Sequence, residues 1–218
     1  MIFRVSVFVF LGIFFTSCFE LIEEVNVNEK GGGKFKLTAN FSQSAGTLKK
    51  LMLVDTAFGI AIPSQGNIEV KIQEAIQALK KIDGISNVSH AQDFSNFMFS
   101  LTYDFSNDST LNKSFIVIAK VFDKNARLPY IPYKIGKNNF IRKHDSGLSE
   151  NQKNKLISKF SVGMETAKFI TIYRFPKEIK STSNTNCKVS KSKKVVFNQV
   201  KLGELILNPK SVSNTISF

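Results

Sequence analysis

Alternation of side-chain type between positions 97 and 105 restricts the fold more than any other feature. Aromatic residues or leucine fill the odd positions of FMFSLTYDF, and Ser100, Thr102 and Asp104 fill even ones. Because successive strand residues point to opposite faces, this period of two predicts a strand with one buried face and one wet face. The segment KFKLTANF, residues 34–41, repeats the pattern. Together the two segments predict an antiparallel sheet.

Helical periodicity lies between these segments. We expect a helix from about residue 67 to 82, capped by Asn67 and stopped by Gly84. Its apolar stripe comprises Ile68, Ile72, Ala75, Ile76 and Leu79. A second helix is predicted after Asn107 or Asp108, and a third after the Ser149 and Gln152 capping box. Helices beside such strands predict an α+β fold, an antiparallel sheet with helices packed on one face.

Two segments are predicted to connect elements. Residues 28–33, NEKGGG, read as the turn of a hairpin; no GK[ST] follows the glycines, so a phosphate-binding loop is not expected. Residues 124–147 contain Pro129 and Pro132, and we expect a long connection with exposed tyrosines and Arg142. Closing strands are predicted at 167–176, 193–200 and 214–218. Whether the last of them pairs with the first hairpin stays open.

The first eighteen residues have the layout of an export signal. A basic start ending at Arg4 precedes an apolar run at 5–15, which is too short for a ~30 Å hydrocarbon layer. Small residues then precede Cys18, and acidic residues follow it. We therefore expect a signal peptide at 1–17 and a single extracytoplasmic α+β domain at 18–218.

Phe15, Thr16, Ser17 and Cys18 resemble the lipobox of bacterial lipoproteins. Phenylalanine replaces the usual leucine, as in signals of the Bacteroidota type. The resemblance implies cleavage before Cys18 and attachment of diacylglycerol and a further acyl chain such as palmitate, and several chains anchor stably. With Phe19 next, it implies an outer-membrane anchor facing the periplasm. The alternatives are an ordinary secretory signal with a chance cysteine, and a buried first strand.

The segment ITIYRFPKEIKSTSN with the following KKVVFNQV is similar to a pattern in mycobacterial LppM-like exported domains. In that pattern a strand ends at Phe-Pro, a polar loop follows, and an exposed β unit begins. The alternative is an ordinary β-turn-β unit. The resemblance implies an exported domain and assigns no site residue.

Charge and composition narrow the classes of partner that we expect for this chain. The net charge is +13, but lysine supplies 26 of the 30 basic residues, and specific phosphate or base recognition favours arginine. We therefore expect no specific nucleic acid, and instead a membrane contact through the lipid, with an envelope protein or an anionic surface as a further partner. Tryptophan is absent, which excludes carbohydrate stacking on indole.

Catalytic candidates are few. His90 and His144 lie in no metal-binding or hydrolase motif, and His144, Asp145 and Ser146 are neighbours, whereas triads assemble from distant segments. Cys187 is expected to be a free loop cysteine. The sequence predicts no catalytic residue, cofactor or metal. Three hypotheses remain: an anchored, non-catalytic binding domain of the envelope, an exported hydrolase without a recognisable motif, and a lysine-rich binder of anionic lipid or polysaccharide.

Overall fold

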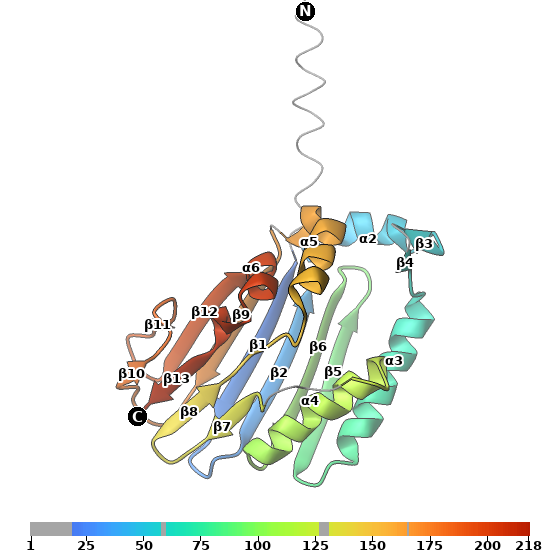
Figure 1. The fold of residues 1–218 in the computed structure, drawn as a ribbon. Coiled ribbons are helices and arrows are strands. Elements are labelled where there is room, and N and C mark those ends of the chain that lie inside the picture. The colour runs from blue at the N-terminus through green and yellow to red at the C-terminus, as the bar shows by residue number, and fades with distance from the viewer. Residues whose placement is uncertain (1–18, 58–59, 127–130, 165) are drawn as a thin grey trace, which may run out of the picture.

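A seven-stranded sheet forms the body of the protein (Figure 1). The computed structural model describes residues 19–218 except 58–59, 127–130 and 165. The predicted signal peptide and the lipobox residues Phe15, Thr16, Ser17 and Cys18 therefore lie outside the described residues. In sheet order the strands are β11 (Lys188–Val189), β12 (Val195–Lys201), β9 (Lys168–Arg174), β1 (Glu20–Val27), β2 (Gly33–Asn40), β6 (Met98–Phe105) and β5 (Ile85–Asp93).

Most neighbouring strands in this sheet run antiparallel, as predicted. The hairpin of β1 and β2 pairs Glu20 with Asn40 and Val27 with Gly33, which confirms the predicted hairpin. One pair differs, because β1 lies parallel to β9 at the centre of the sheet, with Val25 opposite Tyr173. The sheet is thus mixed at one junction, and residues far apart in sequence meet there.

Helices cover one face of this sheet, and the α+β prediction is confirmed. α3 (Gln65–Lys80) and α4 (Asp108–Phe122) pack over the β5–β6 side in Figure 1. Asn107 caps α4 through the Thr110 amide, as one of the two predicted caps. The predicted cap of α3 was wrong: Ser64 caps the helix and accepts from the Asn67 amide, because Asn67 already lies inside the first turn.

A second, four-stranded sheet lies on the same face, and two of its strands, β7 and β8, form within the predicted 124–147 connection. Its order is β10 (Ser181–Thr182), β13 (Asn214–Ser217), β8 (Asn139–Arg142) and β7 (Tyr133–Ile135). Tyr133 and Arg142 were expected to be exposed or in a loop, but they are 1% and 4% exposed, because β7 and β8 turn them toward the large sheet. The last strand, β13, pairs with β8 and not with the first hairpin.

The remaining elements lie mainly where the chain enters β1. They are η1 (Ser42–Ser44), α2 (Ala45–Leu51), β3 (Thr56–Ala57), β4 (Ile60–Ala61), α5 (Glu150–Met164), α6 (Leu202–Leu207) and η2 (Pro209–Val212). The capping box of α5 is confirmed, since the Ser149 and Gln152 side chains bond to each other's amides. Within the described residues, no helix has the length and hydropathy needed to cross a membrane.

The core lies between the large sheet and the layer above it. Val25, Phe35 and Tyr103 face inward from the large sheet and pack with Leu79 of α3 and Phe140 of β8. Because all these side chains are at most 1% exposed, helices and small sheet share one hydrophobic core. This core fixes the turns of both sheets relative to one another.

Candidate binding site

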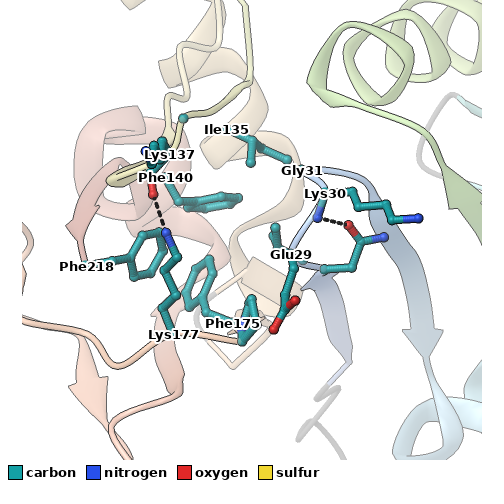
Figure 2. A pocket seen from close by; sticks show the side chains of 13 residues that line it. Glu29, Lys30, Gly31, Ile135, Lys137, Phe140, Phe175, Lys177 and Phe218 are labelled. Atoms are coloured by element: carbon teal, nitrogen blue, oxygen red, sulfur yellow. Dashed lines mark hydrogen bonds between the residues drawn. The ribbon is translucent and has the colours of Figure 1, made fainter.

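Three turns meet at one end of the sheets and enclose a pocket of about 290 Å³ (Figure 2). One wall is the loop between β1 and β2, the second is the turn between β7 and β8, and the third is the segment after β9. The lining residues are Val27, Asn28, Glu29, Lys30, Gly31, Ile135, Gly136, Lys137, Phe140, Phe175, Pro176, Lys177 and Phe218. The volume is at the small end of the range for ligand pockets.

The β1–β2 loop is held in one shape by its own residues. The Asn28 side-chain oxygen accepts from the Lys30 amide at 2.9 Å and the Gly32 amide at 3.1 Å. Gly31 has φ +83°, and a Cβ on Gly33 would lie 2.0 Å from the Asn26 carbonyl oxygen. The glycines predicted as a flexible turn therefore form a tight loop, because only glycine fits both positions.

Aromatic rings form the floor of the pocket. The ring of Phe175 lies 5.2 Å from that of Phe140 and 4.8 Å from that of Phe218, measured between centroids. Phe140 is fully buried and Phe175 is 5% exposed, whereas Phe218 is only half-buried. Figure 2 shows the three rings gathered on one side of the pocket. An apolar group of a ligand would contact this floor, with Phe218 as the accessible ring.

Charged side chains form the rim. Lys137 and Lys177 stand on the aromatic side, and Glu29 and Lys30 on the opposite wall (Figure 2). The Lys177 ammonium donates to the Lys137 carbonyl at 2.8 Å, which ties the β7–β8 turn to the segment after β9. Figure 2 shows the Lys30 side chain extending away from the rings, so Lys137 and Lys177 against Glu29 give the rim its net positive charge. The pocket therefore combines an apolar floor with a cationic mouth.

A buried ion pair fixes the small sheet, and with it Phe140, over the large sheet. The Arg142 guanidinium donates from Nε and Nη2 to the two Glu23 oxygens at 3.1 and 3.0 Å, and the Tyr173 hydroxyl donates to Glu23 at 2.7 Å. Arg142 also donates to the Lys143 carbonyl and lies 5.2 Å from the centroid of the Tyr133 ring. Because Phe140 and Arg142 share one face of β8, the pair positions the pocket floor.

The electrostatics of this pair keep Glu23 ionised. Burial acts to raise the pKa of Glu23, but the charge of Arg142 and the hydrogen bonds from Arg142 and Tyr173 outweigh it and lower the pKa below the usual value. Burial and the neighbouring Glu23 charge raise the pKa of Tyr173 well above its ordinary value. Both side chains are therefore fixed in one protonation state, which suits a structural connection better than proton transfer.

The pocket and the first described residue lie at opposite ends of β1. Phe19 precedes the strand, and Val27 and Asn28 at its other end line the pocket. Eight strand residues span roughly 25 Å at ~3.3 Å per residue. Whatever precedes Phe19 therefore enters the fold far from the pocket mouth.

The catalytic candidates of the sequence are not brought together at this pocket. His90 lies exposed on the edge strand β5, and His144 follows β8, where burial lowers its pKa to about 4. Asp145 and Ser146 accept from the Gly147 and Leu148 amides, so both side chains brace their own loop. Among the described residues, no group of three His, Cys, Asp or Glu side chains could hold a metal ion.

Cys187 is a free cysteine among the described residues. It is half-buried, and its sulfur accepts a hydrogen bond from the side-chain nitrogen Nδ2 of Asn214 at 3.2 Å. Burial raises the pKa of the thiol to about 11, so the reactive thiolate is scarce at neutral pH. This agrees with the expectation of an unreactive loop cysteine.

Sequence reasoning missed the pocket residues. Phe175 and Pro176 were recognised only as the end of a strand, and Phe140 and Phe218 were assigned no role. The available signal was the Phe-Pro pair followed by Ile179, which is 5% exposed and marks a loop that packs inward. Proximity of the three turns depends on pairing between distant strands, which no local pattern reports.

Comparison with solved structures finds more than one similar chain. The solution structure of the folded domain of LppM from Mycobacterium tuberculosis aligns with a TM-score of 0.41 and 13% sequence identity, covering 91% of this chain and 86% of that chain. The sequence matches no protein-family model and no curated protein. The function proposed below does not rest on this similarity.

Proposed function

We propose that this chain is an exported, non-catalytic binding domain, anchored by lipid on Cys18, that holds a small organic anion in the pocket of Figure 2. The observation that carries the proposal is the pairing of an aromatic floor with a lysine rim at the end of β1 opposite Phe19. The expected ligand is a carboxylate, sulfonate or phosphate on an aromatic or branched apolar body.

Geometry supports a ligand of this class. Phe218 offers a half-exposed ring for the apolar body, and Lys137 and Lys177 stand beside it. Ammonium groups on flexible stems attract an anion without fixing its orientation. Removing apolar surface from water would supply most of the affinity, and the charges would select anions over neutral analogues.

The lipobox resemblance supports the anchor. Because Phe19 lies at the end of β1 opposite the pocket, the anchor would hold the pocket away from the membrane. A protein held at Cys18 would carry its pocket roughly 25 Å along β1 from the membrane side. A pocket that faces away from the bilayer suits a ligand or envelope component from the surrounding compartment. We place that compartment at the periplasmic face of an outer membrane.

Calorimetric titration with naphthalene-2-sulfonate and with neutral 2-naphthol tests the pocket, because the two probes share a ring system and differ in charge. We expect the sulfonate to bind more tightly, and its affinity to fall with added salt as the lysine charges are screened. Lys137→Ala with Lys177→Ala should weaken sulfonate binding about fivefold and 2-naphthol binding less, since loss of the Lys177 hydrogen bond to the Lys137 carbonyl acts on both probes alike.

Lys50→Ala, at the opposite end of the fold, is the matched control and should change neither affinity. Phe218→Ala should weaken the binding of both probes, since it removes part of the apolar floor that both would contact. Equal binding of the two probes, or binding of neither, would contradict the proposed pocket function.

A further inference from the structure

The helix α2 and the residues directly after it leave large apolar side chains exposed. None of the seven residues of α2 is buried. Isolated helices shorter than about 12 residues are marginal in water, so a further contact would stabilise this one. We call residues 48–54 the tip.

Composition of the tip combines exposed apolar side chains with positive charge. Leu53 is 85% exposed and Val54 47%, the former being the most exposed large apolar side chain among the described residues. Lys49 and Lys50 are exposed beside them, and Leu48, Leu51 and Met52 are half-buried. Apolar side chains next to lysines are typical of segments that lie in the interface of an anionic bilayer.

The tip lies at the end of the fold where the chain enters β1. Asn40, the last residue of β2, pairs with Glu20, the first of β1. The ring of Phe41 lies 5.0 Å from that of Phe19, and η1 and α2 follow directly. Figure 1 shows α2 at this end of the sheet, opposite the β1–β2 loop. A lipid on Cys18, one residue before Phe19, would hold the tip close to the bilayer.

We propose that the tip is a second membrane contact, in which Leu53 and Val54 insert into the bilayer interface and Lys49 and Lys50 meet anionic headgroups. The proposal rests on the proposed anchor at Cys18. A bilayer is favoured over a second copy of the chain, because the two adjacent lysines would repel their counterparts in a symmetric pair. The contact would fix the orientation of the anchored domain, with the pocket facing away from the membrane.

Tryptophan fluorescence tests the tip directly, because the chain contains no tryptophan. The full protein carrying Leu53→Trp is reconstituted into vesicles of phosphatidylcholine and phosphatidylglycerol that contain brominated lipid. We expect a blue-shifted emission that the brominated lipid quenches. Val189→Trp is the matched control: Val189 is 43% exposed, and its strand pairs through β12 and β9 toward the pocket end. Its emission should be unquenched.

A second measurement covers the chance that the tryptophan itself drives insertion. In protein with unmodified Cys18, Leu53→Glu with Val54→Glu should lower binding to the same vesicles about tenfold or more. Vesicles of phosphatidylcholine alone should bind the parent chain more weakly. Unchanged vesicle binding in the double variant overturns the proposal. So does Leu53→Trp emission that the brominated lipid does not quench.

The anchor and the tip fail separately. The mass of the amino-terminal peptide reports the lipid on Cys18, and quenching reports the tip. A protein that carries lipid on Cys18 but has an unquenched Leu53→Trp overturns the tip and leaves the anchor standing. A protein whose Cys18 is unmodified overturns the anchor, and the binding of that protein to the vesicles then decides whether the tip contacts the bilayer.

Discussion

Arg142 neutralises Glu23 in the interior between the two sheets. Both side chains are 4% exposed, and the Arg142 Nη2 lies 3.0 Å from a Glu23 oxygen. Arg142→Met would leave the carboxylate buried without its partner, so we expect the free energy of unfolding to fall by about 3–5 kcal/mol in urea denaturation. Glu23→Gln combined with Arg142→Met should recover part of this loss, since no charge then remains buried.

A more exposed pair of the same kind provides the control. Arg174 contacts Glu24 at 2.8 Å, and the two side chains are 42% and 21% exposed. Arg174→Met should cost less than about 1 kcal/mol, because water screens this pair. Equal losses for the two arginine variants would show that burial of the Glu23 pair is not what makes it important.

His144 gives stability a pH dependence. Burial lowers the pKa of His144 from 6.5 to about 4, with the Arg142 charge acting in the same direction. Between these pH values the unfolded chain binds more protons than the folded one, so stability is lost as the pH falls through this window. In His90→Gln protein, which keeps one histidine, an NMR titration should place the ring pKa near 4.

The stability of a His144→Gln variant checks the same linkage. We expect its unfolding free energy to decline less between pH 6.5 and about 4 than that of the parent chain. A ring that titrates near 6.5, or an unchanged decline in the variant, would mean that His144 is solvated in the folded protein.

At the scale of elements, the β1–β2 hairpin depends on the close approach of its two strands. A Cβ on Gly33 would meet the Asn26 backbone oxygen at 2.0 Å. Gly33→Ala should therefore force the strands apart, cost about 1–3 kcal/mol and lower the melting temperature. It should also weaken the binding of naphthalene-2-sulfonate, because the loop of residues 28–32 would shift with the strand.

Gly66 is the matched control for Gly33. It lies in the first turn of α3, where an added Cβ meets nothing within 4 Å. Gly66→Ala should leave the melting temperature unchanged or raise it, because alanine favours helix over glycine. A Gly33→Ala protein as stable as Gly66→Ala would contradict the packing of the hairpin.

Local patterns predicted the long elements and missed the short ones. The alternation at 97–105 and the capping box at Ser149 each depend on neighbours in sequence, and β6 and α5 formed as expected. β7 has three residues and β8 four, too few to show a period, and Pro132 argued against a strand there. The parallel pairing of β1 with β9 joins segments about 150 residues apart and has no local signature.

The candidate site was less predictable than the fold. Its rim comes from separate turns and its floor from Phe140 of β8, Phe175 after β9 and Phe218 after β13, each of which reads alone as an ordinary core residue. Their common location follows from the order of strands in two sheets, which is a tertiary property. The lipid attachment at Cys18 rests on adjacent residues alone, because a processing signal is recognised as linear sequence, and it stays a prediction.

At the scale of the whole molecule, the two ends of the sheet have different proposed roles. One end carries Phe19, α2 and the apolar tip, and the other carries the lysine-rimmed pocket. An anchor at the first end would leave the pocket open to the surrounding solution. The orientation of the pocket and the membrane contact of the tip both depend on the proposed attachment at Cys18.

The mass of the amino-terminal peptide of the protein extracted from membranes tests this attachment most directly. We predict a peptide that begins at Cys18 and carries the mass of a diacylglycerol with a further acyl chain, and the loss of that species in a Cys18→Ala variant. A mature peptide that begins at another residue, or that contains Cys18 with an unmodified thiol, would contradict the central claim.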